Sequence, residues 1–361
     1  MIPSLAPLTT RLRRRAAAAL AVAVAAVLPL ASSAAPARAD APANASAAAG
    51  YWMVASDGGI FSFGSAKFFG STGNIKLNQP IVGIAASPTG AGYWMVATDG
   101  GIFSFGDAKF FGSTGAIHLN KPIVGMASTP SGKGYWLVAS DGGIFSFGDA
   151  KFFGSTGALK LNKPIVGMTS SPSGAGYWMV ASDGGIFSFG DAQFFGSTGA
   201  IKLAKPITGM AASPSGKGYW FTASDGGVFN YGDAKFFGAA ASHPTKGAVS
   251  AMVPSPDGQG YWQASSAGEL AAFGSALDFG GVPGALARPI VGMTAVPANG
   301  TGDPTGPGTT DTTTAPTTPT TLPGTGLGGF SSTAKLTWGS AADPNKTFTN
   351  QNNQIMHPYA Q

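Results

Sequence analysis

The stretch "GYWMVASDGGIFSFGDAQFFGSTG", at residues 176–199, decides the fold because the chain repeats it with little change. It contains short runs rich in β-branched and aromatic residues, which is the composition of β-strands. Asp-Gly-Gly separates the first two runs, and Asp-Gly between apolar runs predicts a tight hairpin with the Asp-Gly pair at the centre of the turn. No part of the repeat has the apolar spacing of an amphipathic helix.

Tyr-Trp pairs mark the period of the repeat. They begin at residues 51, 93, 135, 177, 219 and 261, so the spacing is 42 residues each time. Each unit predicts four strands, typified by "YWMVAS", "IFSFG", "KFFGS" and "PIVGM", with a loop before the fourth. Four short strands in a unit of this length are typical of one blade of a β-propeller.

The two ends of the array predict how the ring closes. The array begins on a Tyr-Trp strand at Tyr51 and ends on "PIVGMTAVP", residues 289–297, so each end lacks the partner that the other end supplies. An open solenoid would leave unpaired sheet edges at both ends. We therefore predict an all-β, six-bladed β-propeller over residues 50–297, closed by pairing of the strand at Ile290 with the N-terminal blade. Another blade number and a β-solenoid are the alternatives.

The segment "DGGIFSFGDAKFFGSTG", residues 141–157, resembles a repeat of secreted actinobacterial proteins. In that family the repeat often adjoins an extracellular enzyme domain or a Thr/Pro-rich linker. The likeness covers residues 50 to about 297. The "DGGIFSFG" core is also similar to an element of RCC1-type propellers, which bears on the fold alone. Neither resemblance implies an activity for particular residues.

The segments outside the repeats predict export and a linker. Residues 1–39 combine a basic cluster, a short apolar run and the sequence "ARA", which is typical of a secretory signal peptide; an uncleaved anchor is the alternative. Residues 40–49 form a short linker, and residues 298–330, dominated by Thr, Pro and Gly, form a disordered linker. Residues 331–361 are a short tail, or the start of a truncated domain. We expect a secreted protein, extracellular or associated with the cell wall, without a membrane span in the mature chain.

Charge and cysteine content exclude several classes of function. Of the 21 basic residues, five precede Asp40, which leaves 16 basic residues against 16 acidic ones. Nucleic acids and anionic membranes call for a concentrated basic face, so the balanced total argues against both. The chain has no cysteine, which excludes disulfides and thiol chemistry.

Catalytic residues are not apparent in the sequence. The three histidines, His118, His243 and His357, are scattered, and none belongs to a metal-binding or nucleophile motif. The repeated Asp of "DGG" and the repeated Asp of "FGDA" are typical of turns. We predict a protein that is not an enzyme, with no catalytic residues, no metal site and no cofactor.

The "KFFGSTG" segment is the strongest candidate for a binding surface, because its polar residues precede a variable polar loop. Trp and Phe of the first two strands are expected to fill the core between blades, whereas the Tyr beside each Trp is expected to be more exposed. The candidate ligand-binding residues are Lys67, Lys109, Lys151, Gln193 and Lys235; Ser71, Ser113, Ser155 and Ser197; and Tyr51, Tyr93, Tyr135, Tyr177, Tyr219 and Tyr261.

Near-identical units favour weak sites repeated about a ring, which would bind by avidity. We therefore expect a non-catalytic binding protein, a monomer, whose partner is a cell-wall glycan, another wall polymer or a surface protein. One alternative is an accessory module of an extracellular hydrolase, such as a glycoside hydrolase or peptidase; another is a structural spacer. The fifth and sixth units depart from the repeat, which marks either the closing region of the ring or the real site.

Overall fold

The computed structural model describes residues 49–243, 245–297, 348–349 and 355–356. The inner strands are β3 (Ile81–Ala86), β6 (Ile123–Ser128), β9 (Ile165–Ser170), β12 (Ile207–Ala212), β15 (Val249–Pro254) and β18 (Ile290–Ala295). The middle strands are β1 (Gly50–Ala55), β4 (Gly92–Ala97), β7 (Gly134–Ala139), β10 (Gly176–Ala181), β13 (Gly218–Ala223) and β16 (Gly260–Ser265). The outer strands are β2 (Ile60–Gly64), β5 (Ile102–Gly106), β8 (Ile144–Gly148), β11 (Ile186–Gly190), β14 (Val228–Gly232) and β17 (Leu270–Gly274).

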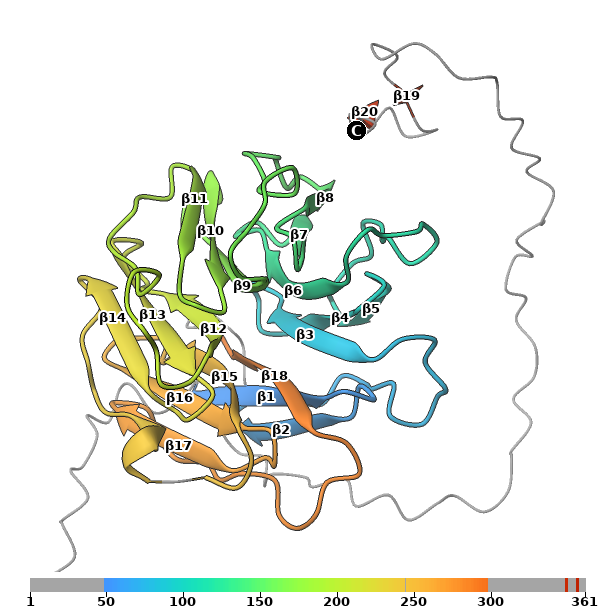
Figure 1. Ribbon diagram of the computed structural model, residues 1–361. Coiled ribbons are helices and arrows are strands. Elements are labelled where there is room, and N and C mark those ends of the chain that lie inside the picture. The colour runs from blue at the N-terminus through green and yellow to red at the C-terminus, as the bar shows by residue number, and fades with distance from the viewer. Residues whose placement is uncertain (1–48, 244, 298–347, 350–354, 357–361) are drawn as a thin grey trace, which may run out of the picture. The chain divides into compact units, whose positions relative to one another are not determined.

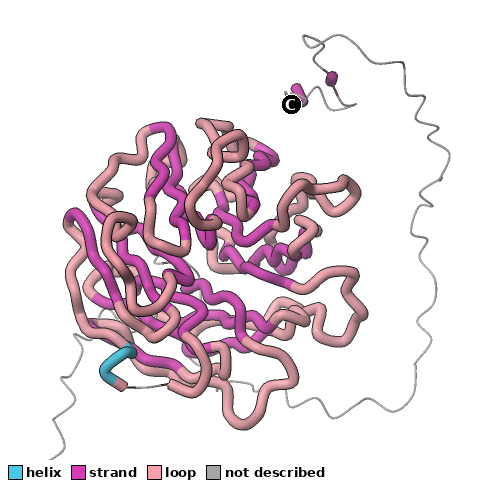
Figure 2. The backbone as a smooth tube through the Cα atoms, in the orientation of Figure 1, coloured by secondary structure: helices cyan, strands magenta, loops and turns pink. Residues whose placement is uncertain are grey.

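These strands form six antiparallel blades of three strands each, ordered inner, middle, outer. Each inner strand contacts the inner strands of both neighbouring blades, so the six inner strands surround one axis (Figure 1). Loops make up most of the remaining backbone of residues 49–297. The one helical turn in the described part of this range is η1 (Ala240–Ser242), drawn in cyan in Figure 2. The predicted six-bladed propeller is confirmed.

The ring closes as the sequence predicts. Strand β18 pairs antiparallel with β1, with Tyr51 opposite Ala295 and Met53 opposite Met293. The first blade, β18-β1-β2, is therefore built from both ends of the repeat array. Every other blade takes its three strands from one continuous stretch of chain.

Aromatic side chains of the middle strands hold neighbouring blades together. Trp52 and Tyr93 are fully buried, and their rings lie 5.5 Å apart across the boundary between the first and second blades. Equivalent Trp–Tyr pairs occur at the other blade boundaries, including Tyr51 with Trp262 where the ring closes. Burial of a large apolar side chain contributes roughly 1.5–3 kcal/mol, so the six copies dominate the stability of the ring. The core role predicted for Trp is confirmed.

The expected fourth strand is absent from each blade, and the "KFFGS" prediction is wrong in this respect. In the first unit, the Trp52 indole N–H donates to the Lys67 carbonyl at 2.7 Å, and the Tyr93 hydroxyl donates to the Gly70 carbonyl at 2.6 Å. The Phe69 N–H donates to the same hydroxyl at 3.2 Å. Side chains of two blades thus satisfy the backbone groups that a strand would pair in a ladder. The segment packs at the blade boundary, where the Phe69 ring lies against both Trp52 and Tyr93.

The hairpin between the middle and outer strands differs from the predicted turn. Its Ala55 carbonyl accepts from the Gly58 N–H at 2.8 Å, which puts Ser56 and Asp57 at the centre of the turn. Gly58 follows with φ +80°, the left-handed conformation that favours glycine. Asp57 accepts the Gly59 N–H at 3.0 Å through Oδ1, so its predicted role in the turn is confirmed although the Asp-Gly pair is not central.

The second repeated Asp ties two turns together rather than capping its own. Asp149 accepts from the Thr129 hydroxyl at 2.9 Å and from the Ser131 hydroxyl at 2.5 Å. In the sixth blade the two partners exchange roles, because Ser275 stands in the Asp position and donates to Asp257 at 2.8 Å. Partial burial works to raise the pKa of Asp257, but the hydrogen bonds from Ser255, Gln259 and Ser275 outweigh it and lower the pKa below its usual value.

The part of the chain after the propeller, Thr312–Gln361, contains one described pair of strands. Strands β19 (Phe348–Thr349) and β20 (Ile355–Met356) pair antiparallel over two residues each. The predicted signal peptide, both predicted linkers except Ala49, and most of the tail lie outside the described residues. Among the residues that the structure describes, no helix has the length and apolar character needed to cross a bilayer.

Candidate binding surface

The "KFF" segments expose one phenylalanine per blade on five consecutive blades. The first Phe of each pair is 48–63% exposed, whereas the second packs against the Trp and Tyr of the blade boundary. The exposed residues are Phe68, Phe110, Phe152, Phe194 and Phe236. We call these five residues the rim phenylalanines. In the sixth blade, Asp278 stands at this position.

The predicted polar residues lie beside the rim phenylalanines. Lys67, Lys109, Lys151, Gln193 and Lys235 are all exposed, as predicted for surface residues. Each carbonyl is held at 2.7 Å by the indole N–H of the Trp in the same unit. The structure distributes these side chains one to a blade and does not gather them into one site. Ser71, Ser113, Ser155 and Ser197 follow in the same segments and are half-buried.

The tyrosines, in contrast, are inaccessible to a ligand. Tyr51, Tyr93, Tyr135, Tyr177, Tyr219 and Tyr261 are 0% exposed, so the expectation that they would be more exposed than the tryptophans is wrong. The reason is the hydroxyl group, which finds its partners inside the blade boundary. Burial raises the pKa of Tyr93 to about 12, while the hydrogen bonds to Phe69 and Gly70 act to lower it. Burial also raises the pKa of the other five tyrosines.

Sequence reasoning missed which apolar residues would be exposed. The rim phenylalanines were not among the predicted binding residues, although they lie in the "KFFGSTG" segment and two adjacent residues of an extended segment cannot both face one core. That alternation is the signal that could have found them. Four aliphatic residues of the following loops, Ile75, Ile117, Leu159 and Ile201, are also exposed and were likewise missed.

At the boundary between the fifth and sixth blades, a buried Gln side chain replaces a backbone hydrogen bond that other blades make. In the fourth blade, the Thr198 N–H donates directly to the Gly184 carbonyl. In the fifth blade Ala240 replaces that Thr, and the buried amide of Gln263 is inserted between the two equivalent groups. Its Oε1 accepts the Ala240 N–H at 2.8 Å, and its Nε2 donates to the Gly226 carbonyl at 3.2 Å. Gln263 therefore compensates for the replacement of Thr by Ala240.

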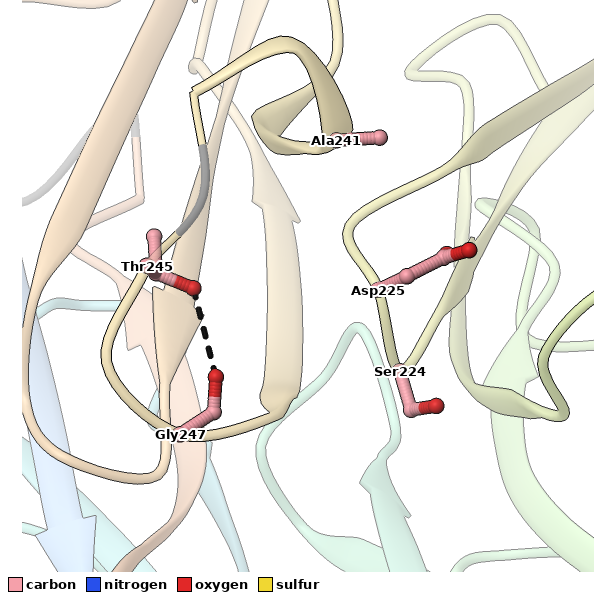
Figure 3. Close-up of a pocket in the computed structure, with 5 residues that line it drawn as sticks. All are labelled: Ser224, Asp225, Ala241, Thr245 and Gly247. Carbon is pink, nitrogen blue, oxygen red and sulfur yellow. Dashed lines mark hydrogen bonds between the residues drawn. The ribbon is translucent and has the colours of Figure 1, made fainter.

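A small depression lies next to this boundary. It is lined by Ser224, Asp225, Ala241, Thr245 and Gly247, and it opens between the hairpin turn of the fifth blade and the loop that follows η1 (Figure 3). One hydrogen bond, from the Thr245 hydroxyl to the Gly247 carbonyl at 3.3 Å, lies within the loop on one side of it. It contains none of the predicted binding residues.

Candidate metal ligands do not cluster in the described ranges. No group of three or more His, Asp or Glu side chains there could hold a metal ion. His118 and His243 are exposed and belong to loops of different blades. His357 lies outside the described residues.

Comparison with known proteins bears on the fold. No protein-family model and no curated protein sequence matches the chain. Among solved structures, a β-propeller chain in the crystal structure of a nidogen/laminin complex is similar, with a TM-score of 0.51 and 10% sequence identity. The match covers 69% of this chain and 98% of that chain. At this identity the likeness shows the fold alone, and the chain is a repeat protein with a β-propeller fold.

Proposed function

We propose that this chain is a secreted, non-catalytic propeller that binds a repetitive partner at the cell envelope, a wall glycan or other wall polymer, through the rim phenylalanines. The observation that carries the proposal is the exposed Phe beside a Lys or Gln, repeated on five consecutive blades. A phenyl ring offers an apolar face to a sugar ring, and the neighbouring amine or amide offers hydrogen bonds to hydroxyl, carboxylate or phosphate groups.

The surroundings of each rim phenylalanine favour binding over mere exposure. The backbone of the first segment is fixed at the Lys67 carbonyl and again at the Phe69 N–H, which flank Phe68 on both sides. A side chain held in place loses less conformational entropy on binding than one on a mobile loop. Exposing five large apolar groups to water is unfavourable for a free protein, and a partner that covers them would remove this cost.

The arrangement fits a polymer better than a small ligand. One contact per blade gives weak sites of similar structure, and a partner with many identical units can occupy several at once. Affinity should then depend on the number of intact sites rather than on any one of them.

The test is co-sedimentation of the full chain with purified cell-wall polymer. We expect Phe110→Ser to weaken binding about two- to fivefold, and replacement of all five rim phenylalanines by Ser to weaken it more than about a hundredfold, as avidity requires. A matched control replaces Ile75, Ile117, Leu159 and Ile201 by Ser, which removes exposed apolar groups elsewhere. Equal losses in the control and in the rim variant would refute the proposal, as would absence of binding by the unaltered chain.

A further inference from the structure

The loops that lead from one blade to the next present four aliphatic side chains to solvent. Ile75, Ile117, Leu159 and Ile201 are 55–57% or, for Leu159, 60% exposed, and they recur at the 42-residue period. We call these four residues the aliphatic tips. Each tip lies in the loop that follows the rim phenylalanine of its unit, and none of the four belongs to the buried core.

These loops lie on the face of the ring that carries the hairpin turns. In the first unit the Thr72 N–H donates to the Gly58 carbonyl at 3.2 Å, and the Ile81 N–H donates to the Ser56 carbonyl at 2.9 Å. Both ends of the loop are thus attached to one hairpin turn. We call this side of the propeller, with the hairpin turns and the loops 73–80, 115–122, 157–164 and 199–206, the turn face.

Each aliphatic tip is held in place by its own loop. The buried Thr72 donates its hydroxyl to the Asp57 carbonyl at 3.1 Å, and the Thr72 carbonyl accepts the Ile75 N–H at 3.0 Å. Leu77, two residues further on, packs inward against the core. The same bonds to Thr114, Thr156 and Thr198 fix the other three tips. The outward direction of the tips is therefore a built feature of four consecutive blades.

The symmetry of the ring places the tips in one plane. Equivalent positions of a propeller are related by rotation about its axis, so they lie at the same height along that axis. The fifth and sixth blades interrupt the series with His243 and Ala285 at this position. The four tips are separated by polar loop residues, and such isolated points fit a flat, fluid surface more readily than a protein partner, which needs continuous complementary contact.

Basic residues are concentrated in the loops of the turn face, although basic and acidic residues are balanced over residues 40–361. The four loops contain six lysines and one histidine but no acidic residue. The lysines are Lys76, Lys121, Lys160, Lys163, Lys202 and Lys205, and all are exposed. The acidic residues of the same blades on this face, Asp57, Asp99, Asp141 and Asp183, are only half-exposed and each accepts an N–H of its own turn. In these four blades the cationic groups are therefore more exposed than the acidic ones, and the exposed acid of a hairpin turn, Asp225, belongs to the fifth blade.

We propose that the turn face docks the propeller on an anionic lipid surface. The aliphatic tips enter the boundary between headgroups and acyl chains, and the lysines extend their amines to the headgroups while their stems cover apolar surface. Several basic side chains close to an anionic membrane add attraction that falls within a Debye length. The proposal is independent of the rim phenylalanines and of their partner.

The test is flotation of the full chain with vesicles of phosphatidylglycerol and phosphatidylcholine, compared with phosphatidylcholine alone. We expect partitioning onto the anionic vesicles to be at least about tenfold stronger, and to weaken at high salt. Replacing the four aliphatic tips by Ser should lower partitioning about tenfold or more, because each tip buries apolar area on insertion. The matched control replaces Phe68, Phe110, Phe152 and Phe194 by Ser, and it should retain partitioning within about twofold.

Four outcomes would overturn the proposal. They are absence of partitioning by the unaltered chain, equal partitioning onto both kinds of vesicle, an equal loss in the control variant, and no loss when the tips are replaced. The last outcome, combined with loss on replacing Lys76, Lys160 and Lys202 by Gln, would assign the face to a soluble polyanion instead. Light scattering of the free chain tests one more occupant. A dimer that the tip variant abolishes would overturn the proposal and assign the tips to a second copy of this chain. Circular dichroism establishes that each variant is folded.

Discussion

The hydroxyl of Tyr135, in the middle strand of the third blade, donates a 2.6 Å hydrogen bond to the carbonyl of Gly112 in the segment that follows the second blade. The Phe111 N–H donates to the same hydroxyl at 3.0 Å. One side-chain oxygen thus joins two successive blades, and the same contact to the preceding segment's glycine recurs for every middle-strand tyrosine of the ring.

Tyr135→Phe should lower the free energy of unfolding by about 1–3 kcal/mol, because it leaves the Gly112 carbonyl and the Phe111 N–H without their partner. Urea denaturation followed by fluorescence measures the change. Tyr231→Phe is the matched control, since Tyr231 stands where the other five blades have Phe. We expect that control to stay within about 0.5 kcal/mol of the unaltered chain. Similar losses in the two variants would contradict the role assigned to the hydroxyl.

Gly112→Ala should destabilise the ring strongly. Gly112 has φ +135°, and an added Cβ would lie 2.5 Å from Cδ1 of Phe147. Gly280 is the equivalent residue of the sixth blade and has φ +92°, but nothing lies within 4 Å of its added Cβ. We expect Gly112→Ala to cost about 1–3 kcal/mol more than Gly280→Ala, the usual penalty for overpacking. Thermal unfolding of the two variants checks this difference, and equal melting temperatures would refute it.

Gln263 should be required for stability only while the fifth blade has Ala240 beside it. Gln263→Met, which introduces the residue found in three other blades, should cost about 1–3 kcal/mol for each buried group left unpaired, namely the Ala240 N–H and the Gly226 carbonyl. Gln263 Nε2 also donates to the buried Thr222 hydroxyl at 2.6 Å, where four other blades have Val. Combining Gln263→Met with Ala240→Thr and Thr222→Val gives the residues found at the boundary between the third and fourth blades. The triple variant should recover most of the loss, because residues in one network are not additive. Denaturant unfolding of the single and triple variants measures the coupling, and a triple variant less stable than the single one would contradict it.

The buried tyrosines should make the fold sensitive to alkali. Burial raises the pKa of Tyr93 from 10.0 to about 12, so the folded state holds the phenol proton more tightly than the unfolded state does. The stability this provides is fully present below pH 10 and is lost as the pH rises toward 12. We expect the melting temperature to be nearly constant from neutral pH to about pH 9 and then to fall steeply, with phenolate absorbance appearing together with unfolding. Phenolate absorbance that rises near pH 10 while the fold persists would refute this prediction.

The sequence predicted the number of blades and the closing strand, because both follow from counting complete units. It failed where one group satisfies another across a blade boundary. Nothing local to "KFFGS" indicates that Trp52 and Tyr93 bind the backbone of that segment, since Trp52 lies 15 residues earlier in the same unit and Tyr93 reaches it across a boundary that only the assembled ring creates. For the same reason the tyrosine hydroxyls suggested exposure. The exposed Lys67 and its equivalents were predicted correctly, because a charged side chain without a partner in its own repeat has few alternatives to solvent.

The pairing of β1 with β18 also constrains the order in which the protein can fold. The first blade cannot be completed until residue 295 has left the ribosome, because its inner strand is the last of the repeat array. Closing a loop as long as the whole ring is a late, entropically costly step, whereas the other blades can form from local contacts. A chain interrupted before Ile290 would present the free edge of β1 to other chains, and an exposed edge of this kind promotes aggregation and strand exchange. Ring closure therefore delays the finished fold until the last strand of the repeat array has been synthesised.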